Sequence, residues 1–333
     1  MALVEHYTGP DTNCCNSRSQ EPPSVRPHHE EEGAFIFERQ DSSSVIRQGV
    51  VEVGGAAVRY TYERPIEADD PVPLIVTPGY GGIKPAYRDL RNSLAIHGKP
   101  AVTFRPPRTQ SMSASFHPKH VFHPDRLLAQ ATSAIARDII ERYGLVEEFA
   151  QVDAVGHSMG GPAVVSAALH RPERFRSITA MAAAGLDGHT LLDMARRAPG
   201  VLRDELLPAV KDIRSRSDTR SVRDIVHYVG RNPWRTAAEG LAVGSGDIRD
   251  KVAAVGSLGV RTAALQFPSD RFFPVDGVRE QAADLFDHFR EFPDPRANHV
   301  WPQLAPEAVA HELVDITKYL GPIIDAEVVP IHR

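Results

Sequence analysis

Short apolar runs alternate with longer amphipathic segments along most of the chain. The first two β-rich runs, SVIRQGVVEV and AAVRYTYERP, are joined by Gly54-Gly55, a dipeptide typical of a two-residue hairpin turn. Most of the later runs are predominantly apolar, which is typical of strands buried on both faces of a sheet. They lie at 73–77, 100–106, 149–156, 176–185, 260–267 and 289–293.

Helical periodicity occupies the segments between these runs. It covers 86–98, 125–144, 159–170 and, near the C-terminus, a stripe of Val309, Leu313, Ile316 and Leu320. Asp125 is expected to cap the second of these helices and Gly144 to end it. Strands and helices that alternate in this way predict an α/β fold whose mostly parallel, doubly wound sheet has helices on both faces.

Residues 187–250 interrupt this alternation. Several short helical patterns follow one another there without a strand between them, so an inserted helical cap is expected. Residues 1–40 are rich in Pro, Ser, Glu, His and Asn and have no hydrophobic period, which is typical of a disordered tail. The α/β core is therefore expected in 41–186 and 251–325.

Composition narrows the classes of function. A net charge of −5 argues against a nucleic-acid partner, because such proteins usually present a basic face. No apolar run is long enough for a transmembrane helix, and the N-terminus lacks the pattern of a secretory signal. The two cysteines, Cys14 and Cys15, are adjacent in a polar tail and cannot form a stabilising disulfide framework. Together these features favour a cytoplasmic protein.

The segment VDAVGHSMGGPAVVSAALH, at 152–170, carries the clearest chemical signal. A serine hydroxyl is a weak nucleophile that needs a nearby base, and a sharp strand-to-helix turn must lift it out of the sheet. Such a turn requires glycine two residues before and two residues after the serine, because the chain passes close to itself. Gly156-x-Ser158-x-Gly160 meets this requirement and predicts that Ser158 is a nucleophile. The alternative is a glycine-rich turn that does no chemistry.

With this motif inside an α/β array, the chain resembles the α/β-hydrolase superfamily, in its serine hydrolase branch, from about residue 45 to 320. The resemblance implies an oxyanion hole made of two backbone N–H groups. One belongs to Tyr80, in the glycine-containing loop VTPGYGG, and the other to Met159, which follows the nucleophile.

The same resemblance implies a catalytic triad in the chain order Ser, acid, His. Asp270 follows the strand at 260–267 and is the expected acid, whereas Asp187 and Asp276 are the alternatives. His299 precedes the last helix on a loop and is the expected general base. The sequence departs from the family pattern at two sites where the family often has glycine, Phe267 before the acid and Asn298 before the base.

Other histidines and arginines of the chain are less suited to these catalytic roles. His288 and His311 are expected within helices, from which a side chain does not easily reach the nucleophile. A cluster in HPKHVFHPD, made of His117, His120 and His123, has no acidic ligand among its histidines, so neither a metal nor a cofactor is expected. For Arg105 and Arg108 the sequence leaves two roles open: binding a substrate carboxylate, or being a solvated charge on a loop.

The resemblance implies an esterase-like or lipase-like serine hydrolase that acts on a small-molecule acyl substrate through an acyl-enzyme on Ser158. Acyl transfer to an acceptor other than water and hydrolysis of a C–C bond use the same groups and remain alternatives. A non-catalytic binding protein on this fold is the alternative from another class. The cap is expected to select the substrate, and the sequence leaves the oligomeric state open.

Overall fold

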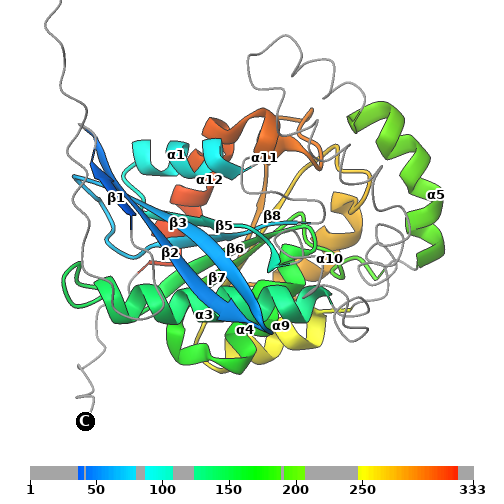
Figure 1. The fold of residues 1–333 in the computed structure, drawn as a ribbon. Helices are drawn as coiled ribbons and strands as arrows, with labels where there is room; N and C mark the ends of the chain where they lie inside the picture. Colours follow the sequence, from blue (N-terminus) through cyan, green and yellow to red (C-terminus); the bar gives the residue numbers. More distant parts are fainter. Residues whose placement is uncertain are drawn as a thin grey trace, which may run out of the picture.

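A nine-stranded sheet forms the centre of the molecule in the computed structural model (Figure 1). The structure describes residues 37–40, 43–79, 87–107, 124–188, 191–206 and 247–321. The strand order is β1-β2-β3-β5-β4-β6-β7-β8-β9, and from β5 to β9 every neighbouring pair is parallel. The predicted α/β class with a mostly parallel sheet is therefore confirmed.

The first three strands form the antiparallel part of the sheet. They are β1 (Phe37–Gln40), β2 (Ser44–Val53) and β3 (Ala56–Pro65). Val53 pairs with Ala56 across Gly54-Gly55, which confirms the predicted hairpin. The parallel strands are β4 (Leu74–Thr77), β5 (Ala101–Phe104), β6 (Val152–His157), β7 (Phe175–Met181), β8 (Arg261–Gln266) and β9 (His288–Glu291).

Helices cover both faces of the sheet, as the mostly apolar parallel strands predict (Figure 1). One face packs against α1 (Arg88–Ile96) and α12 (Pro306–Tyr319). The other packs against α3 (Pro124–Tyr143), α4 (Gly160–His170), α9 (Arg249–Ser257) and α10 (Val275–Leu285). Successive residues of β4 face opposite sides of the sheet. Leu74 and Val76 belong to the core on the side of α1 and α12, and Ile75 belongs to the core on the side of α3 and α4.

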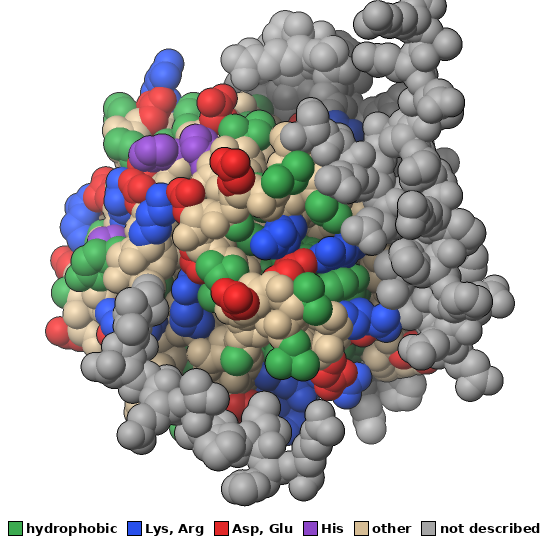
Figure 2. Space-filling view, turned by 90° about the vertical axis from the view of Figure 1, so that its left-hand side faces the viewer, with side chains coloured by type: hydrophobic (Ala, Val, Ile, Leu, Met, Phe, Trp, Pro, Cys, Tyr) green, Lys and Arg blue, Asp and Glu red, His purple; other side chains and the backbone are tan. Residues whose placement is uncertain are grey.

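Four further helical elements complete the described part of the chain. They are the 3₁₀ turn η4 (Pro172–Arg174), the helix α5 (Leu191–Val201) with the π-helical turn η5 (Leu202–Leu206), and α11 (Trp301–Leu304). None of the described helices is long and apolar enough to cross a membrane. On the face drawn in Figure 2, acidic and basic side chains are interspersed.

Three sequence expectations are corrected. The strand β1 lies inside the expected tail 1–40, because FERQ pairs with β2 through its backbone and needs no hydrophobic period. Asp125 lies in the first turn of α3 and does not cap it, since the helix begins at Pro124, whose fixed φ suits a first helical position. His288 lies in β9, where it pairs with β8, and not in a helix.

The predicted cap is described only in part. Residues 191–206 are helical, and 207–246 lie outside the described residues. At the other end, α9 begins at Arg249 within the expected range 187–250, yet Ile248, Val252 and Val255 are buried in the core beneath the sheet. The core therefore begins before residue 250, because these apolar side chains pack against α4 and the sheet.

A buried charge cluster closes the amino end of the parallel strands. Asp153, near the start of β6, is fully buried and accepts hydrogen bonds from Lys99 Nζ at 2.9 Å and Arg176 Nε at 2.9 Å. Asp70 completes the cluster, 2.6 Å from Lys99 Nζ. Lys99 lowers the pKa of Asp153 against the opposing effect of burial. This end of β6 is opposite to the end that carries Ser158.

Candidate active site

Ser158 lies on the sharp turn between β6, which ends at His157, and α4, which begins at Gly160. Its φ of 56° is in the left-handed region, which non-glycine residues rarely adopt and which is frequent at functional sites. Backbone hydrogen bonds fix the turn. Ser158 N–H donates to the carbonyl oxygen of Met181 in β7 at 3.0 Å, and Ser158 O accepts from Gly161 N–H at 3.0 Å. The serine is thereby fixed in a strained conformation at the carboxyl end of the sheet.

The glycines on either side of Ser158 are required by space. A Cβ atom on Gly156 would overlap the carbonyl oxygen of Gly160, and one on Gly160 would overlap the carbonyl oxygen of Thr77 in β4. Backbone atoms cannot move aside as the end of a flexible side chain can. The close passage predicted from the G-x-S-x-G spacing is therefore present in the structure.

Asp270 and His299, 29 residues apart, meet at the same edge of the sheet. The loop after β8 carries Asp270, the loop between β9 and α11 carries His299, and His299 Nδ1 lies 2.9 Å from Asp270 Oδ2. The other carboxylate oxygen of Asp270 accepts from the N–H groups of Phe272 and Phe273 at 2.8 and 3.0 Å. These two bonds fix the orientation of the carboxylate toward the imidazole.

The pKa of His299 is raised above its ordinary value. Burial alone would lower it, since the charged imidazolium loses solvation, but the carboxylate of Asp270 outweighs this effect by attraction and hydrogen bonding. Aromatic rings shield the pair from water, with the centroids of Phe272 and Phe273 lying 4.9 and 5.3 Å from that of His299. The site favours an imidazole that accepts a proton readily.

The two alternative acids are engaged elsewhere. Asp187 accepts a hydrogen bond from Arg197 at 3.3 Å. Asp276 lies in the first turn of α10, is mostly exposed, and pairs with Arg279 at 2.9 Å. The geometry therefore favours Asp270 as the partner of His299.

His157, which precedes the nucleophile, is a site residue that the sequence reasoning missed. Its Nε2 lies 2.9 Å from the carbonyl oxygen of His299, and its Nδ1 lies 2.7 Å from the hydroxyl of Tyr87. The two imidazole rings are 4.9 Å apart between centroids. The position of His157 inside the motif GHSMG is the one sequence signal that pointed to it.

Glu205, in η5, was missed as well. Its two carboxylate oxygens accept from the backbone N–H groups of Arg271 and His299, each at 3.0 Å. Burial, together with the negative charge of Asp270, raises the pKa of Glu205. No local pattern identifies this residue, because its partners lie 66 and 94 positions away.

Of the two predicted oxyanion residues the structure describes Met159 only, which follows Ser158 in the turn. Gly79 packs against the nucleophile, since a Cβ atom there would lie 2.9 Å from that of Ser158. The N–H of Gly79 donates to Tyr87 Oη at 3.2 Å. Met159 is buried and directly precedes α4. Tyr80 lies outside the described residues.

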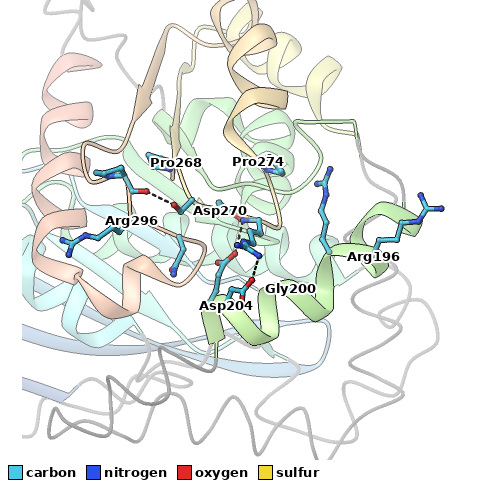
Figure 3. Close-up of a pocket in the computed structure, with 13 residues that line it drawn as sticks. Arg196, Gly200, Asp204, Pro268, Asp270, Pro274 and Arg296 are labelled. Atoms are coloured by element: carbon cyan, nitrogen blue, oxygen red, sulfur yellow. Dashed lines mark hydrogen bonds and ion pairs between the residues drawn. The ribbon is translucent and has the colours of Figure 1, made fainter.

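A cavity of about 860 Å³ is lined by Asp270 and by residues of its loop (Figure 3). Figure 3 shows that α5, with Gly200, runs alongside the loop that carries Asp270. The lining is strongly charged and includes Arg196, Asp204 and Arg296. The acid therefore lies between the core and the helical segment 191–206.

No group of three His, Cys, Asp or Glu side chains suited to hold a metal ion occurs in the described ranges. The histidine cluster noted in the sequence, together with Arg108, lies outside those ranges: His117, His120 and His123.

We compared this architecture with known proteins. No protein-family model and no curated protein sequence matches the chain. Solved structures do match it. A bacterial membrane phospholipase A has a TM-score of 0.59 at 16% identity, with 83% of this chain and 86% of that chain covered. A proline iminopeptidase from Mycobacterium smegmatis has a TM-score of 0.58 at 14% identity, with 82% and 98% covered.

A third likeness is to the thioesterase domain from the curacin biosynthetic pathway, with a TM-score of 0.54 at 14% identity. It covers 81% of this chain and 99% of that chain. At such identities the likeness concerns the fold. The doubly wound sheet, the strand-to-helix turn at Ser158 and these likenesses together show that the chain has the α/β-hydrolase fold.

Proposed function

We propose that this protein is a serine hydrolase that cleaves a carboxylic ester or a related acyl bond of a small molecule. The observation that carries the proposal is the 2.9 Å contact between His299 and Asp270, next to a strained turn that presents Ser158. The solved structures of similar fold support it, because a phospholipase, an iminopeptidase and a thioesterase domain share hydrolysis of an acyl compound.

In the proposed mechanism Asp270 holds the proton of His299 on Nδ1, so that Nε2 is the basic nitrogen. Nε2 removes the proton of Ser158 as its oxygen attacks the acyl carbon, and then delivers the proton to the leaving group. A water molecule, activated by the same nitrogen, hydrolyses the acyl-enzyme. The developing imidazolium is stabilised by the Asp270 carboxylate, consistent with the raised pKa of His299.

The negative oxygen of the tetrahedral intermediate needs two backbone donors. We assign them to the N–H groups of Tyr80 and Met159. The N–H of Gly79 is already bound to Tyr87, so the next N–H along the loop is the natural donor. Each donor of this kind contributes about 3 kcal/mol to the transition state.

A panel of chromogenic esters of increasing acyl length, with Ser158→Ala as the test variant, decides the proposal. We expect the wild-type protein to hydrolyse part of the panel and Ser158→Ala to lose at least about 10³-fold in kcat. Ser166→Ala is the matched control, because it removes the hydroxyl of another largely buried serine, on α4. Activity that survives Ser158→Ala would refute the nucleophile.

Two further tests separate the alternatives. Partition of the acyl-enzyme between water and added alcohols or thiols distinguishes a hydrolase from an acyltransferase. A serine-directed fluorophosphonate distinguishes an enzyme from a non-catalytic binding protein, because a correctly folded protein that stays unlabelled has no activated serine.

A further inference from the structure

Three loops of the candidate site are joined by a chain of buried hydrogen bonds. The N–H of Gly79 donates to Tyr87 Oη at 3.2 Å, and Tyr87 Oη lies 2.7 Å from His157 Nδ1. His157 Nε2 then lies 2.9 Å from the carbonyl oxygen of His299. The chain therefore runs from the loop before the proposed oxyanion donor, past the nucleophile, to the proposed base.

The direction of each proton follows from the partners. A carbonyl oxygen only accepts, so His157 Nε2 carries a hydrogen and donates it to His299. In a neutral imidazole Nδ1 is then the acceptor, so the Tyr87 hydroxyl donates to it. The hydroxyl oxygen of Tyr87 accepts in turn from Gly79 N–H. With His157 neutral, every bond in the chain has one donor and one acceptor.

His157 is held neutral by its surroundings. Burial lowers its pKa well below the ordinary histidine value, and the nearby His299 lowers it further. In the proposed mechanism His299 becomes positively charged, so a charged neighbour with its ring centroid 4.9 Å away would oppose catalysis. The imidazole next to the nucleophile therefore keeps its hydrogen bonds while the base changes charge.

We propose that Tyr87 and His157 are positioning residues, which hold the backbone of the oxyanion loop and the backbone of the base in register around Ser158. The inference rests on the proposed function and adds two residues to it. Both side chains are almost fully buried, Tyr87 with 2% and His157 with 4% of their surface exposed. Tyr87 directly precedes α1, which packs on the core, so the register is set by a rigid element.

Tyr87→Phe tests the chain at its centre, because it removes one hydroxyl and keeps the ring. Gly79 N–H and His157 Nδ1 both lose their partner in this variant. The measurement is the rate of phosphonylation of Ser158 by a small uncharged fluorophosphonate, which needs the base and the oxyanion donors but no knowledge of the substrate. We expect a rate about 10-fold lower, which corresponds to about 1.4 kcal/mol of transition-state stabilisation.

Tyr62→Phe is the matched control. Tyr62 is also a buried tyrosine, and its hydroxyl bonds to Glu147 in the antiparallel part of the sheet. It should lose stability as Tyr87→Phe does but label at the wild-type rate. His157→Gln keeps a donor for the His299 carbonyl and should retain more of the rate than His157→Leu.

The double variant Tyr87→Phe/His157→Leu should be no slower than His157→Leu alone, since the chain is already broken there. A wild-type labelling rate in folded Tyr87→Phe, or an equal loss in Tyr62→Phe, overturns the positioning role and leaves the serine hydrolase intact. An unlabelled wild-type protein instead overturns the proposed function itself, so the two failures are distinguishable.

Discussion

Replacing Asp270 with asparagine tests the proposed acid without changing its shape. The amide oxygen can still accept from the N–H groups of Phe272 and Phe273, which lie at 2.8 and 3.0 Å. The amide nitrogen then faces Nδ1 of His299, where a carboxylate oxygen lies at 2.9 Å. Because two donors repel, His299 shifts its proton to Nε2 and no longer accepts the proton of Ser158.

The size of the effect follows from two losses. A carboxylate and an imidazolium whose charges are about 4 Å apart attract by about 4 kcal/mol at an effective dielectric constant of about 20. Loss of that attraction in the transition state lowers the rate by about 10³-fold. The wrong tautomer adds to this loss, and the same change in a Ser-His-Asp triad of known mechanism costs about 10⁴-fold. We expect kcat to fall by about 10³- to 10⁴-fold with a much smaller change in KM.

The assay is hydrolysis of the best ester of the panel, with kcat and KM measured across a pH series. Asp187→Asn is the matched control, since Asp187 is the alternative acid and pairs with Arg197. It should keep activity within a few-fold. If Asp187→Asn loses activity while Asp270→Asn retains it, the acid is Asp187, and the reasoning from the 2.9 Å contact of Asp270 with His299 is refuted.

Three other predictions follow from the charges of the site and core. Because Asp270 raises the pKa of His299, and the base must be neutral to act, kcat/KM should rise with pH through a midpoint above the ordinary histidine value of about 6.5; a lower midpoint contradicts the assignment. Glu205→Ala leaves the N–H groups of Arg271 and His299 without their acceptor and should lower kcat by about 10-fold or more, with folding checked by thermal melting. Asp153→Ala removes one carboxylate from the buried Lys99 and should lower the free energy of unfolding by about 3 kcal/mol in urea titrations. Since the pKa of Asp153 is lowered on folding, its stabilising contribution is present above the unfolded pKa and is lost as pH falls, so the difference from the wild type should shrink in acid.

The fold was predictable from the sequence where the residues of a strand themselves show why it forms. The run at 152–157 is mostly apolar because β6 is buried on both faces, with Asp153 paired to buried cations, and its end is marked by glycines that the backbone requires. Asp270 and His299 could be found because both lie just past a strand end, where parallel strands deliver side chains to one edge. The edge strand Phe37–Gln40 was missed because its pairing with β2 is a backbone interaction.

The contacts that His157 makes in the site could not be predicted from the sequence. His157 reaches Tyr87, 70 positions away, and the backbone of His299, 142 positions away. A histidine inside the motif GHSMG indicates neither partner, because a hydrogen bond between distant segments produces no periodic pattern in the local sequence. Such contacts depend on which loops the finished sheet brings together, and a single sequence does not encode that in a local pattern.

Glu205 connects the segment expected to select the substrate with the loops that carry the proposed acid and base. A carboxylate only accepts hydrogen bonds, so its two oxygens can take the N–H groups of Arg271 and His299 at once. Burial and the negative charge of Asp270 raise its pKa, so neither favours a carboxylate at this position. The geometry of the base loop does explain it, since a neutral amide would lose one of the two bonds. Segment 191–206 therefore supports the position of His299 as well as lining the cavity, and substitutions in it are expected to change kcat together with KM.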